Sequence, residues 1–172
     1  MSWMHEYPRP QLQRDSFFCL NGEWTANGQR VQVPYPLQSA LSGWKGDVPE
    51  HVEYEKLFVL PNGFAKPTER IRLHFGAVDQ IAEVWLNGKP VMRHEGGYLP
   101  FWADITEEIL PDEENRLCVC VTDELDRCLP YGKQCKKPHG MWYTPVTGIW
   151  QSVWLEAVPE TCVEQLCNHA ES

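Results

Sequence analysis

The most informative part of this chain is the run Trp142-Tyr143-Thr144-Pro145-Val146-Thr147-Gly148-Ile149-Trp150-Gln151-Ser152-Val153-Trp154. Its first half combines aromatic rings with Pro145 and Gly148, which is typical of a loop. From Ile149 to Glu156 the residues alternate in two sets, as they do in a β-strand. Aromatic rings on a loop present flat apolar faces with polar edges, which suit the CH-rich face of a sugar ring. The run therefore predicts an aromatic, ligand-binding loop that leads into a strand.

The rest of the chain shows the same pattern of short strands. Apolar residues alternate with polar ones through residues 70–75 and 117–122, and residues 81–92 predict a hairpin around the turn Asn87-Gly88. Earlier strands are predicted at residues 17–20, 30–33 and 53–60. Because helical periodicity is almost absent, we expect an all-β fold, a two-sheet antiparallel sandwich of the jelly-roll type. Periodicity alone does not separate a jelly roll from an immunoglobulin-like sandwich.

Composition limits the class of protein and of partner. The chain has 172 residues, which suits one domain, and its net charge is −9. This acidic balance argues against a nucleic-acid partner, which calls for basic patches. No apolar run approaches the about 18 residues of a membrane span, and residues 1–7 show no signal-peptide pattern. We therefore expect no membrane partner and a cytoplasmic location.

The seven cysteines are an odd number and include no C-x-x-C pair. Cys118 and Cys120 are predicted to share one face of a strand, and Cys162 and Cys167 have no histidine at ligand spacing. We interpret the cysteines as free thiols in a reducing compartment rather than as a disulfide framework or a zinc site. We predict no metal and no cofactor. Jelly rolls of this type can hold a structural calcium ion, but no Asp/Asn loop here is specific enough to assign one.

Several separate segments of the chain follow the order seen in one known family. They are Tyr7-Pro8-Arg9-Pro10 with Leu20-Asn21-Gly22-Glu23-Trp24, Val33-Pro34-Tyr35-Pro36, Phe75-Gly76-Ala77-Val78-Asp79 with Val84-Trp85-Leu86-Asn87-Gly88, Glu95-Gly96-Gly97-Tyr98 with Pro100-Phe101, Asp104-Ile105-Thr106 with Asn115-Arg116-Leu117, and Gly148-Ile149-Trp150-Gln151-Ser152-Val153-Trp154-Leu155. Together they resemble the N-terminal sugar-binding domain of glycoside hydrolase family 2, the β-galactosidase and β-glucuronidase family. The resemblance implies a galactose-binding-domain-like jelly roll that forms one part of a carbohydrate-cleaving enzyme.

The same resemblance implies where hydrolysis takes place. Family members hydrolyse β-glycosides with retention by means of two glutamates. Both lie in a (β/α)8 barrel that follows an immunoglobulin-like domain, and such a barrel needs about 250 residues. We therefore expect a β-glycosidase as the parent protein, no catalytic residue in this chain and no activity of the chain alone. The carboxylates that the sequence offers are interpreted as solvated strand ends and turns: Asp79, Glu83, Glu95, Asp104 and the pair Glu107-Glu108.

The aromatic loop is the predicted sugar contact. Trp142 and Tyr143 occupy the position at which family members place a loop beside the substrate pocket. Several members carry a carboxylate just ahead of that loop, whereas His139 and Gly140 stand here. We predict Trp142, Tyr143 and His139 as substrate-binding residues, with packing against a neighbouring domain as the alternative for Trp142. The loop of residues 35–44 is a second candidate to reach the pocket.

Other residues near the aromatic loop leave two interpretations open. Lys133, Lys136 and Lys137 lie just upstream, where they either meet an acidic sugar or only solvate the loop. Trp150 and Trp154 are predicted to share one strand face and to serve as core or interface residues. The fold does not determine the sugar, since relatives process galactosides, glucuronides and mannosides.

We place the sugar-binding domain, with its N-terminal arm, at residues 1–160. Residues 161–172 are interpreted as the truncated start of a following immunoglobulin-like domain, with a strand that begins at residues 162–166. The expected partners are a β-glycoside and the remaining domains of the parent enzyme, which in this family often forms a homo-oligomer. The alternatives are a standalone carbohydrate-binding module, with Trp142 and Tyr143 as its binding surface, and a purely structural interaction domain.

Overall fold

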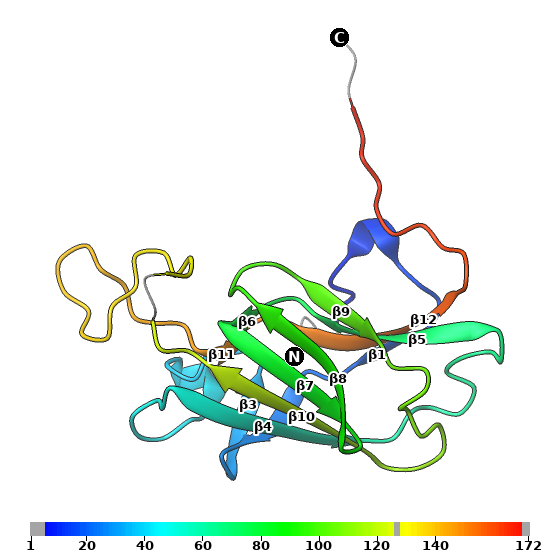
Figure 1. Cartoon of the computed structure of the whole chain (residues 1–172), viewed down its shortest axis with the longest axis horizontal. Coiled ribbons are helices and arrows are strands. Elements are labelled where there is room, and N and C mark those ends of the chain that lie inside the picture. The colour runs from blue at the N-terminus through cyan, green and yellow to red at the C-terminus, as the bar shows by residue number, and fades with distance from the viewer. Residues whose placement is uncertain (1–5, 126–127, 170–172) are drawn as a thin grey trace.

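The computed structural model describes residues 6–125 and 128–169. Two antiparallel sheets stack against each other (Figure 1), and a third sheet has two strands. In chain order the elements are η2 (Pro10–Leu12), β1 (Phe17–Cys19), β2 (Gly22–Ala26), β3 (Gln29–Val33), η3 (Ala40–Ser42), β4 (His51–Phe58), β5 (Glu69–Phe75), β6 (Val78–Asp79), β7 (Ile81–Leu86), β8 (Lys89–Glu95), β9 (Phe101–Asp104), β10 (Asn115–Thr122), β11 (Gly148–Ile149) and β12 (Val153–Pro159). The predicted fold class, an all-β two-sheet antiparallel sandwich of the jelly-roll type, is confirmed.

The larger sheet has the strand order β3-β2-β4-β10-β7-β8. Its central strand β10 alternates as predicted: Leu117 and Val119 are buried, whereas Cys118 and Cys120 share the outer face. Two hairpins turn at Asn27-Gly28 and Asn87-Gly88, and φ at these four residues lies between 44° and 82°. Positive φ at both central positions matches the twist of the flanking strands, and Asn-Gly adopts it readily. The predicted hairpin at residues 81–92 is confirmed.

The smaller sheet has the strand order β1-β12-β5-β9, and β12 is buried on both faces. Val153 and Leu155 pack in the core between the sheets. On the opposite face, Trp154 and Glu156 lie beneath the N-terminal arm, where the Arg9 guanidinium lies 5.7 Å from the centre of the Trp154 ring. The arm therefore covers a sheet face that would otherwise meet water.

The predicted continuous strand from Ile149 onward is wrong. β11 ends at Ile149, and β12 begins only at Val153. Between them the chain passes from the small β6–β11 sheet to the four-stranded sheet, and the Gly76 amide donates to the Ser152 carbonyl. As a result Trp150 and Trp154 do not share one strand face: Trp154 is buried, while half-buried Trp150 donates its indole N–H to the Gly97 carbonyl at 2.8 Å.

The last described residues also differ from the prediction. Residues 162–166 form no strand, and the chain beyond Pro159 extends away from both sheets (Figure 1). An extended segment forms a strand only where it pairs with a sheet edge, and residues 162–166 do not pair with one. It still contacts the rest of the domain, because Glu164 forms a 3.0 Å ion pair with Arg72 and the Val163 carbonyl accepts a hydrogen bond from Arg14. The assignment of residues 161–172 to a following domain stays a prediction.

Candidate functional site

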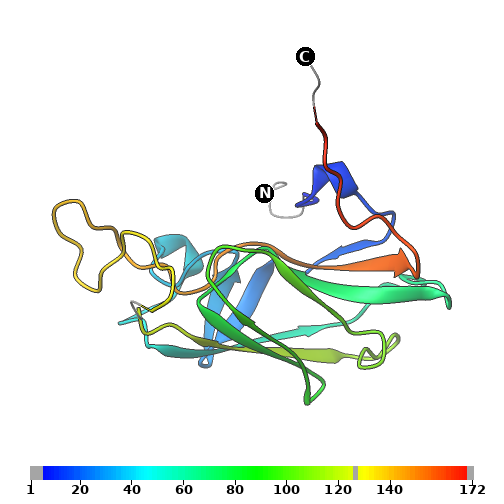
Figure 2. The ribbon, with the colours of Figure 1, turned by 45° about the horizontal axis from the view of Figure 1, so that its top comes forward.

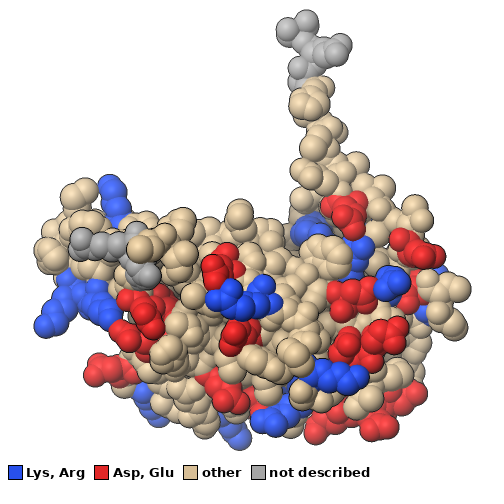
Figure 3. All heavy atoms as spheres, in the orientation of Figure 1, with Lys and Arg blue, Asp and Glu red and all other residues tan. Residues whose placement is uncertain are grey.

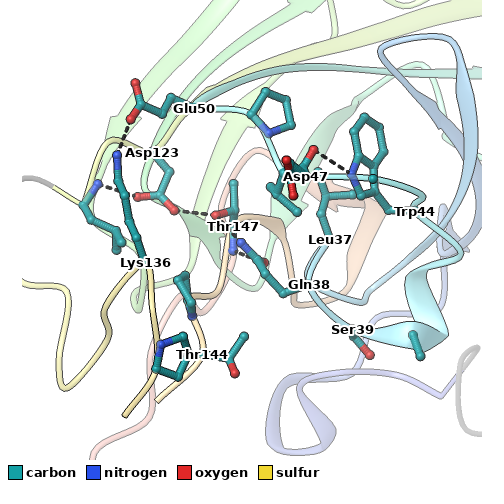
Figure 4. A pocket seen from close by; sticks show the side chains of 17 residues that line it. Leu37, Gln38, Ser39, Trp44, Asp47, Glu50, Asp123, Lys136, Thr144 and Thr147 are labelled. Carbon is teal, nitrogen blue, oxygen red and sulfur yellow. Dashed lines mark hydrogen bonds and ion pairs between the residues drawn. The ribbon is translucent and has the colours of Figure 1, made fainter. Parts of the chain in front are cut away.

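Residues 128–147 form a loop that projects from one end of the sandwich (Figure 2). At this end the residues around the loop line a cleft of about 670 Å³. One wall is the loop between β3 and β4, and the other is formed by the residues between β10 and β11 (Figure 4). Its volume falls in the range of small-molecule sites. The lining residues are Leu37, Gln38, Ser39, Ala40, Trp44, Gly46, Asp47, Val48, Pro49, Glu50, Asp123, Leu125, Lys136, Pro138, Thr144, Pro145 and Thr147.

The first wall is held by the short helical turn η3. Ser39 caps it by accepting a hydrogen bond from the Leu41 amide at 3.2 Å. Gly43 ends it with φ of 76°, a left-handed conformation that glycine adopts without steric cost. The next residue, Trp44, packs against the core and donates its indole N–H to the Asp47 carbonyl at 3.3 Å. The Trp44 ring thus lies in the first wall of the cleft, directly after a turn that hydrogen bonds hold in place.

The floor of the cleft is a hydrogen-bonded junction between the two walls. The Thr147 amide donates to Gln38 Oε1 at 2.9 Å, and Gln38 Nε2 donates to Thr147 Oγ1 at 2.8 Å. The Thr147 hydroxyl donates to Asp123 Oδ2 at 2.6 Å (Figure 4). Asp123 also accepts from the Leu125 amide at 3.1 Å. These contacts hold the two walls at a fixed spacing. They also occupy the Asp123 carboxylate with hydrogen bonds from Thr147 and Leu125.

Across the cleft, Glu50 of the first wall forms an ion pair with Lys136 of the second. The hydrogen bond and the charge of Lys136 lower the pKa of Glu50, and Glu50 raises the pKa of Lys136. Both groups are exposed, so water screens the pair, which contributes little to stability. The pair bridges the two walls of the cleft.

Next to the lining residue Thr147, Gly148 pairs with Asp79 of β6. Asp79, interpreted above as a solvated carboxylate, is only 2% exposed. Burial, followed by the negative charge of Asp123, raises the pKa of Asp79 to about 7. The prediction of a solvated Asp79 is therefore wrong. The signal available in the sequence is its place directly after the apolar residues Ala77 and Val78.

The predicted sugar contacts lie beyond the cleft, on the projecting loop. Trp142 is 40% and Tyr143 is 67% exposed, and His139 is exposed as well. The Trp142 amide donates to the His139 carbonyl at 3.0 Å, which closes a turn that brings these three residues together. None of the three is among the described residues that line the cleft.

Residues next to His139, Trp142 and Tyr143 do line the cleft, and so does the second predicted loop, residues 35–44. Lys136, Pro138, Thr144 and Pro145 flank the three predicted residues in sequence and face the cleft. From residues 35–44, the cleft is lined by Leu37, Gln38, Ser39, Ala40 and Trp44. Sequence reasoning therefore found both loops but not Asp123, Thr147 or Glu50, which come together only through long-range contacts.

The described surface carries charges of both signs. On the face drawn in Figure 3, acidic and basic side chains are interspersed over the described part of the sandwich, and the net charge is −9. The described residues contain no group of three or more His, Cys, Asp or Glu placed to hold a metal ion. They also contain no helix long and apolar enough to span a bilayer.

Residues 10–159 match the model of the family described as glycosyl hydrolases family 2, sugar binding domain. The chain belongs to glycoside hydrolase family 2. This family 2 chain is 32% identical over 117 residues to a β-glucuronidase of Paenibacillus borealis, which covers 64% of the chain and 19% of that protein. It is 32% identical over 99 residues to a β-galactosidase of Thermoanaerobacter pseudethanolicus, with 57% of the chain and 13% of that protein covered.

The fold of the family 2 chain matches solved enzymes as well. The β-glucuronidase of Ruminococcus gnavus superposes on it with a TM-score of 0.67 at 26% identity, covering 91% of the chain and 31% of that enzyme. The chain thus spans between about an eighth and a third of these relatives' lengths. The resemblance inferred from its sequence segments is confirmed.

Proposed function

We propose that this chain is the non-catalytic N-terminal sugar-binding domain of a longer, retaining β-glycosidase. The observation that carries the proposal is the family match over residues 10–159 in a chain that spans only 19% of its β-glucuronidase relative. Retaining hydrolysis requires two carboxyl groups about 5 Å apart, one acting as nucleophile and one as acid/base. In the cleft, Asp123 is bound to Thr147 and Glu50 to Lys136, which favours a role in shape rather than in bond cleavage.

In this proposal the cleft and the projecting loop form one side of the substrate entrance of the parent enzyme. Trp142 and Tyr143 offer exposed rings that stack on a sugar, and His139 offers a hydrogen-bonding edge beside them. The remaining domains of the parent supply the other side and the catalytic glutamates. The acidic chain with free thiols at Cys118 and Cys120 suits a cytoplasmic setting.

A β-glucuronide is the first substrate class to test. Two of the relatives named above are β-glucuronidases. The loop that carries Trp142 also carries Lys133, Lys136 and Lys137, which are cations in a chain of net charge −9. A uronic-acid carboxylate that approaches this loop meets a favourable local charge.

The test compares two proteins from the same source gene. The full-length protein and this chain are each incubated with aryl β-glucuronide and aryl β-galactoside, and release of the phenol is followed. We expect turnover of one of these substrates by the full-length protein, with the anomeric configuration retained by NMR, and none by the chain. Hydrolysis by the chain alone, or an inverted product from the full-length protein, contradicts the proposal.

The exposed ring pair also favours a second candidate, a carbohydrate-binding module that works without the other domains. It predicts saturable binding of a β-glycoside to the chain, measured by calorimetry, and a loss of at least about fivefold in affinity in Trp142→Ala, because stacking of a sugar on one aromatic ring contributes about 1 kcal/mol or more. Trp102→Ala is the matched control, since Trp102 is similarly exposed, at 42%, but lies on β9 and not on the projecting loop. No binding, or equal losses in both variants, excludes this candidate.

A further inference from the structure

The projecting loop, residues 128–147, is held from inside by the buried side chain of Gln134. Its amide nitrogen donates to the Tyr131 carbonyl at 2.6 Å and to the Tyr98 hydroxyl at 3.1 Å, and its oxygen accepts from the Val146 amide at 2.6 Å. These three hydrogen bonds join the first part of the loop to its last part and to the connection between β8 and β9.

A side-chain amide suits these partners. The Tyr131 carbonyl requires a donor, whereas the Val146 amide requires an acceptor, and one amide group offers both. A carboxylate has no donor, an ammonium group has no acceptor, and asparagine is shorter by one methylene group. Gln134 therefore supplies the hydrogen bonds that the backbone of this irregular segment would otherwise lack in a buried place.

The backbone on either side of Gln134 holds the aromatic residues. Gln134 and Tyr143 form an isolated parallel bridge. In it the Tyr143 amide donates to the Lys133 carbonyl at 2.8 Å, and the Cys135 amide donates to the Tyr143 carbonyl at 3.2 Å. Because the rings of Trp142 and Tyr143 are largely exposed, packing contributes little to their position. Their position therefore depends on the hydrogen bonds of the loop.

The anchor is attached to the sandwich at two places. The Tyr98 ring contacts the Trp150 ring edge-on, with 6.4 Å between the ring centres, and the Trp150 indole donates to the Gly97 carbonyl. A second buried glutamine, Gln80, donates from its amide to the Pro130 carbonyl at 2.9 Å. The base of the loop is thus fixed to the sandwich, and Gln134 extends this order to the part that carries the rings.

We propose that Gln134 is a positioning residue for sugar binding: it holds Trp142 and Tyr143 in the place from which their rings stack on a sugar. The inference deepens the proposed function and rests on it, since the role of the two rings is taken from there. The physical reason is pre-organisation. A loop that is ordered before the sugar arrives loses little conformational freedom on binding, whereas a loose loop has to be ordered at the expense of affinity.

Hydrogen exchange of the chain tests the anchor without any sugar. Gln134→Met keeps the length of the side chain and removes its hydrogen bonds. The Tyr143 and Cys135 amides are followed, because neither bonds to the Gln134 side chain and both report the backbone beside the rings. We expect their protection to fall at least about tenfold. Tyr98→Phe removes one hydrogen bond of the anchor and should lower protection about three- to tenfold.

A matched control separates the anchor from a general loss of stability. The Gln29 side chain donates to the Lys45 carbonyl and accepts from the Lys45 amide, both at 3.3 Å, in the loop between β3 and β4. Gln29→Met makes the same chemical change away from the projecting loop and should leave the two amides unchanged. Unchanged protection in Gln134→Met, or an equal loss in Gln29→Met, overturns the proposal. If Gln134→Met does not fold, Tyr98→Phe decides by the same criteria.

Kinetics of the full-length protein distinguish positioning from a merely structural role. On the aryl β-glycoside that it hydrolyses, we expect Gln134→Met to raise KM about threefold or more and to change kcat less than about twofold. Only molecules with the rings in place bind well, and stacking that is equal in the ground and transition states affects KM alone. Gln13→Met, at an exposed position of the N-terminal arm, is the control and should change neither constant.

An unchanged KM in Gln134→Met, or a loss in kcat alone, overturns the role in sugar binding. If the native full-length protein hydrolyses neither aryl β-glycoside, the proposed function fails, and the role in sugar binding fails with it. The exchange experiment still shows in that case whether Gln134 holds the loop, so the two failures are distinguishable.

Discussion

At the scale of single residues, Glu156 gathers several charged and polar partners. It is fully buried on β12 and accepts hydrogen bonds from Arg9 at 2.7 Å, from the Trp154 indole at 2.7 Å and from the Tyr7 hydroxyl. His74 lies 3.4 Å away. Burial alone would raise the pKa of Glu156, but the neighbouring His74 imidazole and the hydrogen bonds from Tyr7 and Trp154 outweigh it and hold the pKa well below its usual range. Glu156 therefore attaches the N-terminal arm to the sheet.

We expect Glu156→Gln to destabilise the fold by about 2–4 kcal/mol, since it leaves the Arg9 charge without its partner in a largely buried site. Urea denaturation at pH 7 measures this loss. Because the folded pKa is depressed, the stabilisation is present above about pH 4.5 and disappears as the pH falls. The difference between the two proteins should therefore shrink on acidification. Glu53→Gln, at an exposed position of β4, is the control and should cost at most about 0.5 kcal/mol. A native-like Glu156→Gln would show that the arm is held by other contacts.

At the scale of elements, the strand β11 depends on a glycine. Gly148 has φ of 94°, and a Cβ at this position would overlap the hydroxyl of buried Tyr54. The strand is therefore able to pair with β6 only because the residue has no side chain. Gly88 also has a positive φ, 82°, but a Cβ there would meet open space. Substitution of the two glycines therefore separates the cost of backbone strain from the cost of steric overlap.

We expect Gly88→Ala to cost about 1 kcal/mol, the strain of a positive φ alone. Gly148→Ala should cost about 2–4 kcal/mol, because displacement of Tyr54 from the core adds to that strain. Thermal and urea denaturation of both variants provide the comparison. Equal costs would mean that Tyr54 moves aside freely and that β11 does not depend on this close approach.

At the scale of the whole molecule, local signals predicted the elements better than the contacts between them. The sequence predicts the alternation in β10 and the Asn87-Gly88 turn, because periodicity and turn chemistry act within a few residues. The turn at Asn27-Gly28 carries the same sequence signal. The strand expected from Ile149 to Glu156 failed because the chain changes sheets at Gln151 and Ser152, and this depends on Gly76, which is distant in sequence.

The fold class and the family could be predicted from the sequence, because both rest on patterns of strands, turns and short segments along the chain. Which charged side chains are buried, and which residues meet at the cleft, became clear only from the three-dimensional structure. Asp79 and Glu156 look alike as acidic residues at strand ends or in alternating strands. In the fold, Asp79 is set beside a second carboxylate and Glu156 beside a guanidinium. The charge state of a group depends on desolvation and on neighbours brought in from distant parts of the chain.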